Sequence, residues 1–373
     1  MDFTLSEEQQ AIADLAAQIF EDQATPERVK EVEGGADRID RGLWAKLAEA
    51  NLLGIALPED AGGSGYGIVE LCLVLEQQGR RVAPVPLLPT LVMGALPIAQ
   101  LGTTEQRARW LPGVATGEVV LTAALAEVAS GTLGPGVAAT PDGSAWRLDG
   151  AAVSVPAAHL AARVLVPARR PGGDLGVYLV DPGASGVARQ AAQTTDRGVA
   201  AHLTFTNTPI PPEDVLGGDD VGDDTIGWIL DRAMVGLCAL QVGVAEEALR
   251  MAAEYTSARH QFGRPLATFQ GAALKAADAY IDTEAMRATM WQAAWRMSQG
   301  MDATDAVAVA KWWAADAGHR VVHTTQHLHG GLGADVDYPI HRYFLWGKQI
   351  EVTLGGASQQ LARLGREIAA ANR

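Results

Sequence analysis

The sequence predicts an α+β protein in which two helical regions flank a β-rich one. Apolar residues recur at helical spacing up to about residue 118 and again after residue 225. Between them lie short β-favouring runs bounded by Gly, Pro and Asp, with no long helix. We therefore expect an N-terminal helical domain over residues 1–118, a middle antiparallel β domain over 119–222 and a C-terminal four-helix bundle over 223–373.

The first helix is predicted from a local signal. Ser6 and Gln9 have the spacing of a capping box. An apolar stripe at helical spacing follows, made of Ile12, Leu15, Ala16, Ile19 and Phe20. Pro58 and a cluster of glycines in "LLGIALPEDAGGSGYG" then predict a loop, after which "IVELCLVLEQQGRR" resumes a helix.

The middle region reads as several short strands. The runs are "PDGSAWRLDGAAVSV", "ARVLVPARR", "LGVYLVDPG" and "AHLTFTNTPIPP". They suggest a small antiparallel sandwich or barrel, and the acidic, Gly-rich "GGDDVGDD" at 217–224 has the composition of a connector.

Two long helices are predicted in the last region. One face of the first carries Val244, Ala245, Ala248, Leu249, Ala252 and Tyr255. The second runs through "AVAVAKWWAADAGHRVVHTTQ" and ends at Gly330-Gly331.

Bulk composition excludes several classes of protein. The net charge of −15 argues against a nucleic-acid binder and against attraction to anionic membranes. Cys72 and Cys238, the only cysteines, are too few for a disulfide framework or a zinc cluster. The start "MDFTLSEEQQ" lacks the pattern of a secretory signal, and no apolar run approaches the length of a membrane span. We expect a cytoplasmic enzyme or scaffold.

Two stretches could carry chemistry. In "ARHQFGRPLATFQ", residues 258–270, Arg259 and Arg264 flank an aromatic residue and a glycine. This pattern fits either a solvated helix end followed by a turn or an anion site built on an arginine fork.

The second stretch is "QHLHGGLGADVDYPIHRYF", residues 326–344. His327, His329, His341 and Asp335 could suggest a metal site. No metal is expected, because His327 and His329 point to different helix faces and no carboxylate has suitable spacing to them. Gly330, Gly331 and Gly333 instead suit a helix end that meets a phosphate or an adenine.

Taken together, these stretches resemble the acyl-CoA dehydrogenase family almost from end to end. The matching segments are "FTLSEEQQ", "LLGIALPEDAGGSGYG", "TNTPIPPEDVLGG", "ARHQFGRPLATFQ" and "HLHGGLG", in the family's order and spacing. The resemblance implies an FAD-dependent enzyme in which a glutamate removes the Cα proton of an acyl-CoA thioester while a hydride leaves Cβ for the flavin. It also implies an electron-transferring flavoprotein as electron acceptor.

The resemblance further implies a flavin shared between subunits. The family's Arg-x-x-Phe-Gly stretch and Gly-Gly turn reach over to the FAD held mainly by a neighbour. The matching cofactor-binding positions are Arg259, Gln261, Phe262, Gln270, Gly330 and Gly331. His327 stands where the family usually has glutamine and can still donate a hydrogen bond. Gln359 is a further expected FAD contact.

The residues of the chain's own active site depart from the family pattern. Aligned on Gly356 and Gln359, "VTLGGASQQ" puts Gly355 at the usual position of the catalytic glutamate. Some members carry this base earlier, at the position that is Ala233 here, and the adjacent family arginine is Met234. Asp231 could be a displaced base, or a solvated acid near the helix start.

The middle region departs as well. The family's Thr-Glu-Pro-like and Trp-Ile-Thr stretches touch the flavin ring and the acyl chain. The corresponding segments here are "LAEVASGTLG" and "VSVPAAHLAA", in which neither pattern is intact.

We therefore expect no catalytic base in this chain, which would complete the FAD site of a homologous glutamate-bearing subunit in an α2β2 complex. The ending "DYPIHRYFLWGKQIEVTLGGA" resembles actinobacterial pairs that act on steroid side-chain CoA esters. Arg363 or Arg366 could meet a CoA phosphate, or be ordinary surface arginines. Two alternatives remain: a self-sufficient homotetramer that uses a displaced base, and a flavin-free scaffold.

Overall fold

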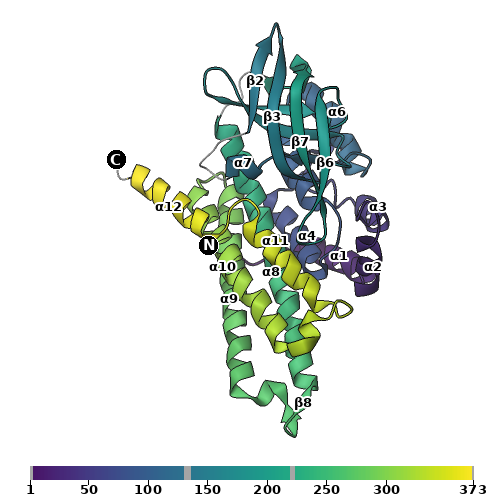
Figure 1. Ribbon diagram of the computed structural model, residues 1–373, viewed down its shortest axis with the longest axis vertical. Helices are drawn as coiled ribbons and strands as arrows, with labels where there is room; N and C mark the ends of the chain where they lie inside the picture. The colour runs from purple at the N-terminus through teal and green to yellow at the C-terminus, as the bar shows by residue number, and fades with distance from the viewer. Residues whose placement is uncertain (1–2, 130–135, 219–222, 372–373) are drawn as a thin grey trace. The chain divides into compact units, whose positions relative to one another are not determined.

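The computed structural model describes residues 3–129, 136–218 and 223–371 (Figure 1). The chain forms two compact units. The bundle unit comprises Met1–Glu31, Cys72–Ala83 and Val235–Arg373, and the sheet unit comprises Val32–Leu71 and Pro84–Met234. The expected connector at 217–224 and the segment "LAEVASGTLG" lie partly outside the described residues.

The bundle unit is built from long helices. Its elements, some of which continue into the sheet unit, are α1 (Glu7–Gln23), α2 (Pro26–Glu33), α4 (Ile68–Arg81), α8 (Asp223–Ala258), β8 (His260–Gln261), β9 (Arg264–Pro265), η5 (Leu266–Thr268), α9 (Gln270–Ser298), α10 (Thr304–Leu328), η6 (Gly330–Ala334), α11 (Ile340–Val352) and α12 (Ala357–Ala371). Helix α10 packs against α9, α11 and α12. Helix α10 also packs closely against α8. A Cβ added to Gly318 of α10 would lie only 2.3 Å from the side-chain nitrogen of Gln241 on α8.

The first helix begins as its capping box predicts. The Ser6 hydroxyl accepts a hydrogen bond from the Gln9 amide, and the Gln9 side chain accepts one from the Ser6 amide. The buried face is displaced from the expected stripe: Ala13, Ala16 and Phe20 are buried, whereas Leu15 is 41% exposed.

Charged residues inside the bundle unit are paired across helices. The Arg287 guanidinium on α9 contacts the Glu76 carboxylate on α4 and lies 2.8 Å from that of Glu246 on α8. Burial raises the pKa of Glu76, and the Arg287 charge opposes that rise. Lys311 on α10 is also buried, and its Nζ donates to the Ile350 and Glu351 carbonyl oxygens at 3.0 and 3.3 Å.

The sheet unit holds the β region that the sequence predicts. Its strands are β1 (Leu121–Ala123), β2 (Val137–Asp142), β3 (Ala145–Pro156), β4 (Arg163–Arg169), β5 (Leu175–Val180), β6 (Val187–Gln193) and β7 (Val199–Ile210). They form one sheet in the order β1-β4-β2-β3-β7-β6, with β5 paired to β4. Figure 1 labels the neighbouring strands β2, β3, β7 and β6 of this sheet. Most pairings are antiparallel, as expected, but β1 and β2 both run parallel to β4.

Helical segments complete the sheet unit. They are α3 (Arg41–Glu49), η1 (Glu59–Ala61), η2 (Leu88–Ala95), α5 (Leu96–Leu101), α6 (Thr104–Ala115), α7 (Ala126–Ala129) and η3 (Pro212–Asp214). The core against the sheet is apolar and includes the fully buried Tyr178, Leu203 and Phe205.

Within the part of the chain that the structure describes, one helix is apolar and long enough, by length and composition alone, to cross a membrane. It is the stretch Asp224–Ala258, and 78% of its apolar window is buried inside the protein, as in a core helix. This finding corrects the expectation that no apolar run approaches the length of a membrane span.

Candidate functional site

The Arg-Gln-Phe-Gly stretch forms a hairpin at the end of α8. Strands β8 and β9 pair Gln261 with Arg264. The two residues between them, Phe262 and Gly263, have φ values of 54° and 82°. Positive φ at both positions is the geometry of a type I′ turn, in which Gly263 is unstrained and Phe262 carries the strain.

This hairpin presents its side chains to solvent. Phe262 is 92% exposed, an unusual state for so large an apolar ring. Arg259 and Gln261 are also exposed, and among the described residues no carboxylate pairs with the Arg259 guanidinium. Arg264 instead lies over the Phe269 ring at 4.1 Å. Both arginines of the fork expected from the sequence are therefore exposed, and Arg264 also contacts an aromatic ring.

The glycine turn lies at the end of α10. Gly330 has a φ of 59°, and a Cβ at Gly330 or Gly331 would meet no atom within 4 Å. The two glycines thus leave open backbone beside the exposed His327, an arrangement that suits close approach by an anionic group. His329 is buried whereas His327 is exposed, as their opposite helix faces predict.

The hairpin and the glycine turn are neighbours. Tyr255, one turn before Arg259, stacks on His329 with 4.8 Å between ring centroids. Gln270 is the first residue of α9, which follows the hairpin after the short helix η5, and it is exposed. The structure therefore brings most of the predicted cofactor-binding residues to one end of the bundle unit.

Gln359 and Gly355 lie elsewhere in the same unit. Lys311 ties the end of α11 to the first half of α10, about 25 Å along that helix from the glycine turn. The side-chain oxygen of Gln359 accepts a hydrogen bond from the Gly356 amide at 2.9 Å and so caps α12. Gln359 is therefore separated from the other predicted contacts within one chain.

The two residues that the resemblance would place at the position of the catalytic base have no carboxylate. Gly355 has no side chain and has a φ of 98°. Ala233 is fully buried on α8. Next to Asp231, the Arg232 guanidinium lies over the Trp228 ring at 3.6 Å; burial lowers the pKa of Arg232 to about 10, an effect that the Asp231 charge opposes. Asp231 thus has a cationic neighbour, as a structural acid would.

The middle-domain segments are bonded to other parts of the sheet unit. The Val153 amide of β3 donates to the Glu127 carboxylate of α7 at 2.5 Å, and the Ser154 amide donates to His202 Nδ1 at 3.2 Å. Strand β3 is irregular here, with a register shift between Ala152 and Val155 and a φ of 52° at Ser154. Two backbone donors of "VSVPAAHLAA" are thus already occupied by side chains of this chain.

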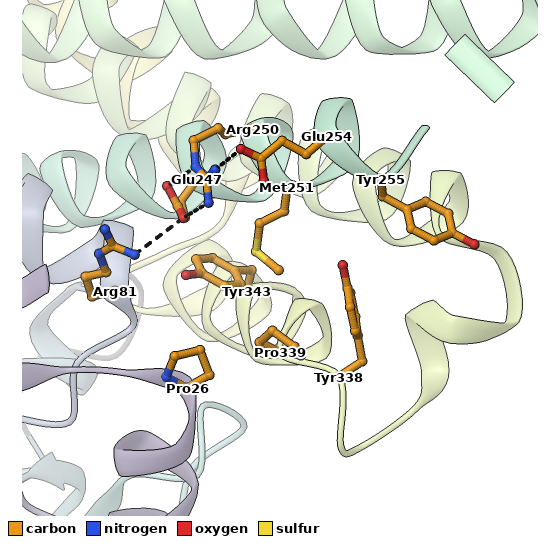
Figure 2. A pocket seen from close by; sticks show the side chains of 10 residues that line it. All are labelled: Pro26, Arg81, Glu247, Arg250, Met251, Glu254, Tyr255, Tyr338, Pro339 and Tyr343. Carbon is orange, nitrogen blue, oxygen red and sulfur yellow. Dashed lines mark hydrogen bonds and ion pairs between the residues drawn. The ribbon is translucent and has the colours of Figure 1, made fainter. Parts of the chain in front are cut away.

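A cavity of about 250 Å³ lies in the bundle unit (Figure 2). Arg81 and Arg250 face it, but both pair with Glu247, and Glu254 also contacts Arg250. These carboxylates offset the two cations, so the cavity is not a phosphate site. Among the described residues, no three His, Cys, Asp or Glu side chains come together to hold a metal ion.

The chain matches the family model for the acyl-CoA dehydrogenase N-terminal domain over residues 6–118 and that for the C-terminal domain over residues 222–369. The chain belongs to the acyl-CoA dehydrogenase family. Members of this family are FAD-dependent oxidoreductases that act on CH–CH bonds.

Similar proteins include a curated acyl-CoA dehydrogenase and chains of two solved structures. It is 40% identical to the acyl-CoA dehydrogenase FadE27 of Mycobacterium tuberculosis, over 99% of both chains. It also resembles a chain of a variant of the Tcur3481-Tcur3483 steroid acyl-CoA dehydrogenase, with 50% identity, a TM-score of 0.92 and 99% of both chains covered. For the ChsE4-ChsE5 complex from Mycobacterium tuberculosis the identity is 40% and the TM-score 0.93, again with 99% of both chains covered.

The two units of this acyl-CoA dehydrogenase chain differ in how they fit FAD. In the bundle unit, Arg259, the exposed Phe262 ring and the open Gly330-Gly331 backbone fit an anionic, partly aromatic group. In the sheet unit, the Glu127 carboxylate and His202 take up backbone donors in one of the segments that would face the flavin. The absence of the family motifs from this segment stays a prediction. These two hydrogen bonds could not be predicted from the sequence, because Glu127 and His202 are distant in sequence from Val153.

Proposed function

We propose that this chain is the subunit of a two-component acyl-CoA dehydrogenase that lacks the catalytic glutamate. Its hairpin and glycine turn would complete the FAD site of a homologous partner that carries the base, in an α2β2 complex. The observation that carries the proposal is the contrast within the chain: the elements that would reach a neighbour's cofactor are exposed and open, whereas the base positions are Gly355 and the buried Ala233.

The chemistry explains why a partner is needed. The α-proton of a thioester is weakly acidic, so dehydrogenation needs a carboxylate positioned against Cα and donors that polarise the carbonyl. Bound FAD supplies the hydride acceptor. In this division of labour, Arg259 pairs with an anionic part of the cofactor, Phe262 covers an apolar part, and the Gly330-Gly331 backbone allows close approach.

The substrate class is a second part of the proposal. The names of two similar structures refer to a steroid acyl-CoA dehydrogenase and to a two-component complex. We propose a CoA thioester with a bulky, steroid-derived acyl group as substrate and an electron-transferring flavoprotein as electron acceptor. Dehydrogenation of such a thioester by the purified complex, and its absence with short-chain acyl-CoA, tests this choice.

Arg259→Ala tests the cofactor role directly. In the complex purified with its glutamate-bearing partner, loss of a charge-assisted hydrogen bond should weaken FAD binding by about 10- to 100-fold. The matched control is Arg107→Ala, which removes an equally exposed arginine from α6 and should leave FAD binding unchanged. Unchanged flavin content and turnover in Arg259→Ala would refute the role and favour a flavin-free scaffold.

A displaced base is the remaining alternative. If Asp231 served as the base of a self-sufficient homotetramer, Asp231→Asn would abolish turnover with the flavin retained. The proposed function predicts that Asp231→Asn leaves the turnover of the two-component complex unchanged.

A further inference from the structure

Three aromatic rings are stacked where α8 and α10 end. Tyr255 belongs to the last turn of α8, His329 directly follows α10, and Tyr338 precedes α11. The His329 ring is nearly parallel to that of Tyr255, with 4.8 Å between centroids and 22° between planes. On the Tyr338 side the centroid distance is 5.3 Å and the angle 51°. Figure 2 shows the two tyrosines at the edge of the cavity.

His329 is held firmly in this stack. It is only 1% exposed, and its Nδ1 lies 2.7 Å from the Thr325 carbonyl oxygen. A carbonyl can only accept, so Nδ1 carries the hydrogen. Burial lowers the pKa of His329, while the bond to Thr325 opposes this shift. The ring is thus fixed by one hydrogen bond and two aromatic contacts.

Tyr255 and His329 each lie just before one of the two exposed segments, the hairpin and the glycine turn. The Tyr255 carbonyl oxygen accepts a hydrogen bond from the Arg259 amide at 2.8 Å, and the Arg259 carbonyl in turn accepts one from Leu266 at 2.9 Å. His329 is bonded directly to Gly330 in sequence. The contact between Tyr255 and His329 therefore joins the origin of the hairpin to the origin of the glycine turn.

We infer that the Tyr255–His329–Tyr338 stack sets the separation between Arg259 and the Gly330-Gly331 turn, and that His329 is its central positioning residue. The inference rests on the proposed function, because a fixed separation matters only if both segments bind the same cofactor. Two anchors with a defined spacing bind a ligand more tightly than two that move independently, since less motion is lost on binding.

Two substitutions distinguish the contribution of the aromatic ring of His329 from that of its hydrogen bond. His329→Leu removes the aromatic stack and the hydrogen bond, whereas His329→Phe keeps a ring between the tyrosines. In the complex purified with the glutamate-bearing partner, we expect His329→Leu to weaken FAD binding roughly tenfold. The FAD affinity of His329→Phe should remain within about threefold of the wild-type value, because the retained ring still packs between the tyrosines.

Val307→Ala is the control for a general loss of stability. Val307 is fully buried on the same helix, about 30 Å from the stack. The Val307→Ala variant should have a lower melting temperature but should not show the tenfold loss of FAD affinity. Equal losses of affinity in Val307→Ala and His329→Leu would overturn the inference, as would equal losses in the Leu and Phe variants.

Arg259→Ala, measured alongside, separates this inference from the proposed function. If Arg259→Ala weakens FAD binding but His329→Leu does not, the stack has no positioning role and the proposed function stands. If Arg259→Ala has no effect, the proposed function fails and the inference with it. Amide hydrogen exchange of the chain alone is an independent measurement. His329→Leu should speed exchange in both residues 259–266 and residues 330–334. Unchanged exchange would contradict a positioning role for the stack.

Discussion

Gly355 is the residue that we expect, from the family resemblance, at the position of the catalytic glutamate, and its backbone does not readily accept a side chain. Its φ is 98°, so a residue with a Cβ costs about 1–2 kcal/mol there. The new Cβ would also lie 2.8 Å from the Gln360 amide nitrogen. That amide is buried and donates to the Leu354 carbonyl oxygen at 3.1 Å, so displacing it costs about 1 kcal/mol more.

Gly355→Glu should therefore destabilise the chain by about 2–3 kcal/mol, which corresponds to a fall of roughly 1 M in the urea midpoint. Tryptophan fluorescence and circular dichroism during urea unfolding of the purified chain measure this. The control is Gly356→Ala, whose Cβ would meet its nearest neighbour at 3.7 Å. Gly356→Ala should lower the free energy of unfolding by less than about 1 kcal/mol, because its one effect is that alanine caps a helix less well than glycine does.

Two results would refute this reasoning. A Gly355→Glu chain that unfolds at the wild-type urea concentration would show that the backbone at Gly355 is not strained. Dehydrogenation by the Gly355→Glu chain alone would show that only the carboxylate is missing from its own site.

Two further predictions concern buried charges in the bundle unit. Burial lowers the pKa of Lys311 from 10.5 to about 8. Between these values the unfolded chain holds a proton that the folded chain has lost, so the free energy of unfolding should rise by about 3 kcal/mol as pH rises from 8 to 10.5. Urea unfolding at several pH values should show that Lys311→Met loses this rise, and an unchanged pH profile would contradict it. Arg287→Met should lower the free energy of unfolding by about 3–5 kcal/mol, because it leaves the buried Glu76 carboxylate without its partner; the double variant Arg287→Met/Glu76→Leu should recover much of the loss, and no recovery would count against the pairing.

Local signals in the sequence were sufficient for several elements. The capping box at Ser6 and Gln9, and the end of α10 before Gly330, were predicted because each depends on residues a few positions apart. The two helical regions followed from the helical spacing of apolar residues, and the β region from short β-favouring runs bounded by Gly, Pro and Asp. The domain boundaries at 118 and 222 stay predictions, as do the individual cofactor contacts.

Features that depend on distant residues could not be predicted from the sequence. Leu15 appeared to belong to the buried face of α1, but which side of a wide apolar stripe is covered depends on the partner helix. The parallel pairing of β1 with β4 depends on the path of the chain through the sheet. The bond from Val153 to Glu127 and the stack around His329 each join segments whose proximity only the fold sets.

Flavin content of this chain purified alone, and again after co-expression with a glutamate-bearing homologue, tests the central claim most directly. Visible absorbance and protein concentration give FAD per chain. We expect a colourless chain alone and a yellow complex with one FAD for each pair of unlike subunits. About one FAD per chain in the protein purified alone would contradict it, because the chain's own site would then be complete.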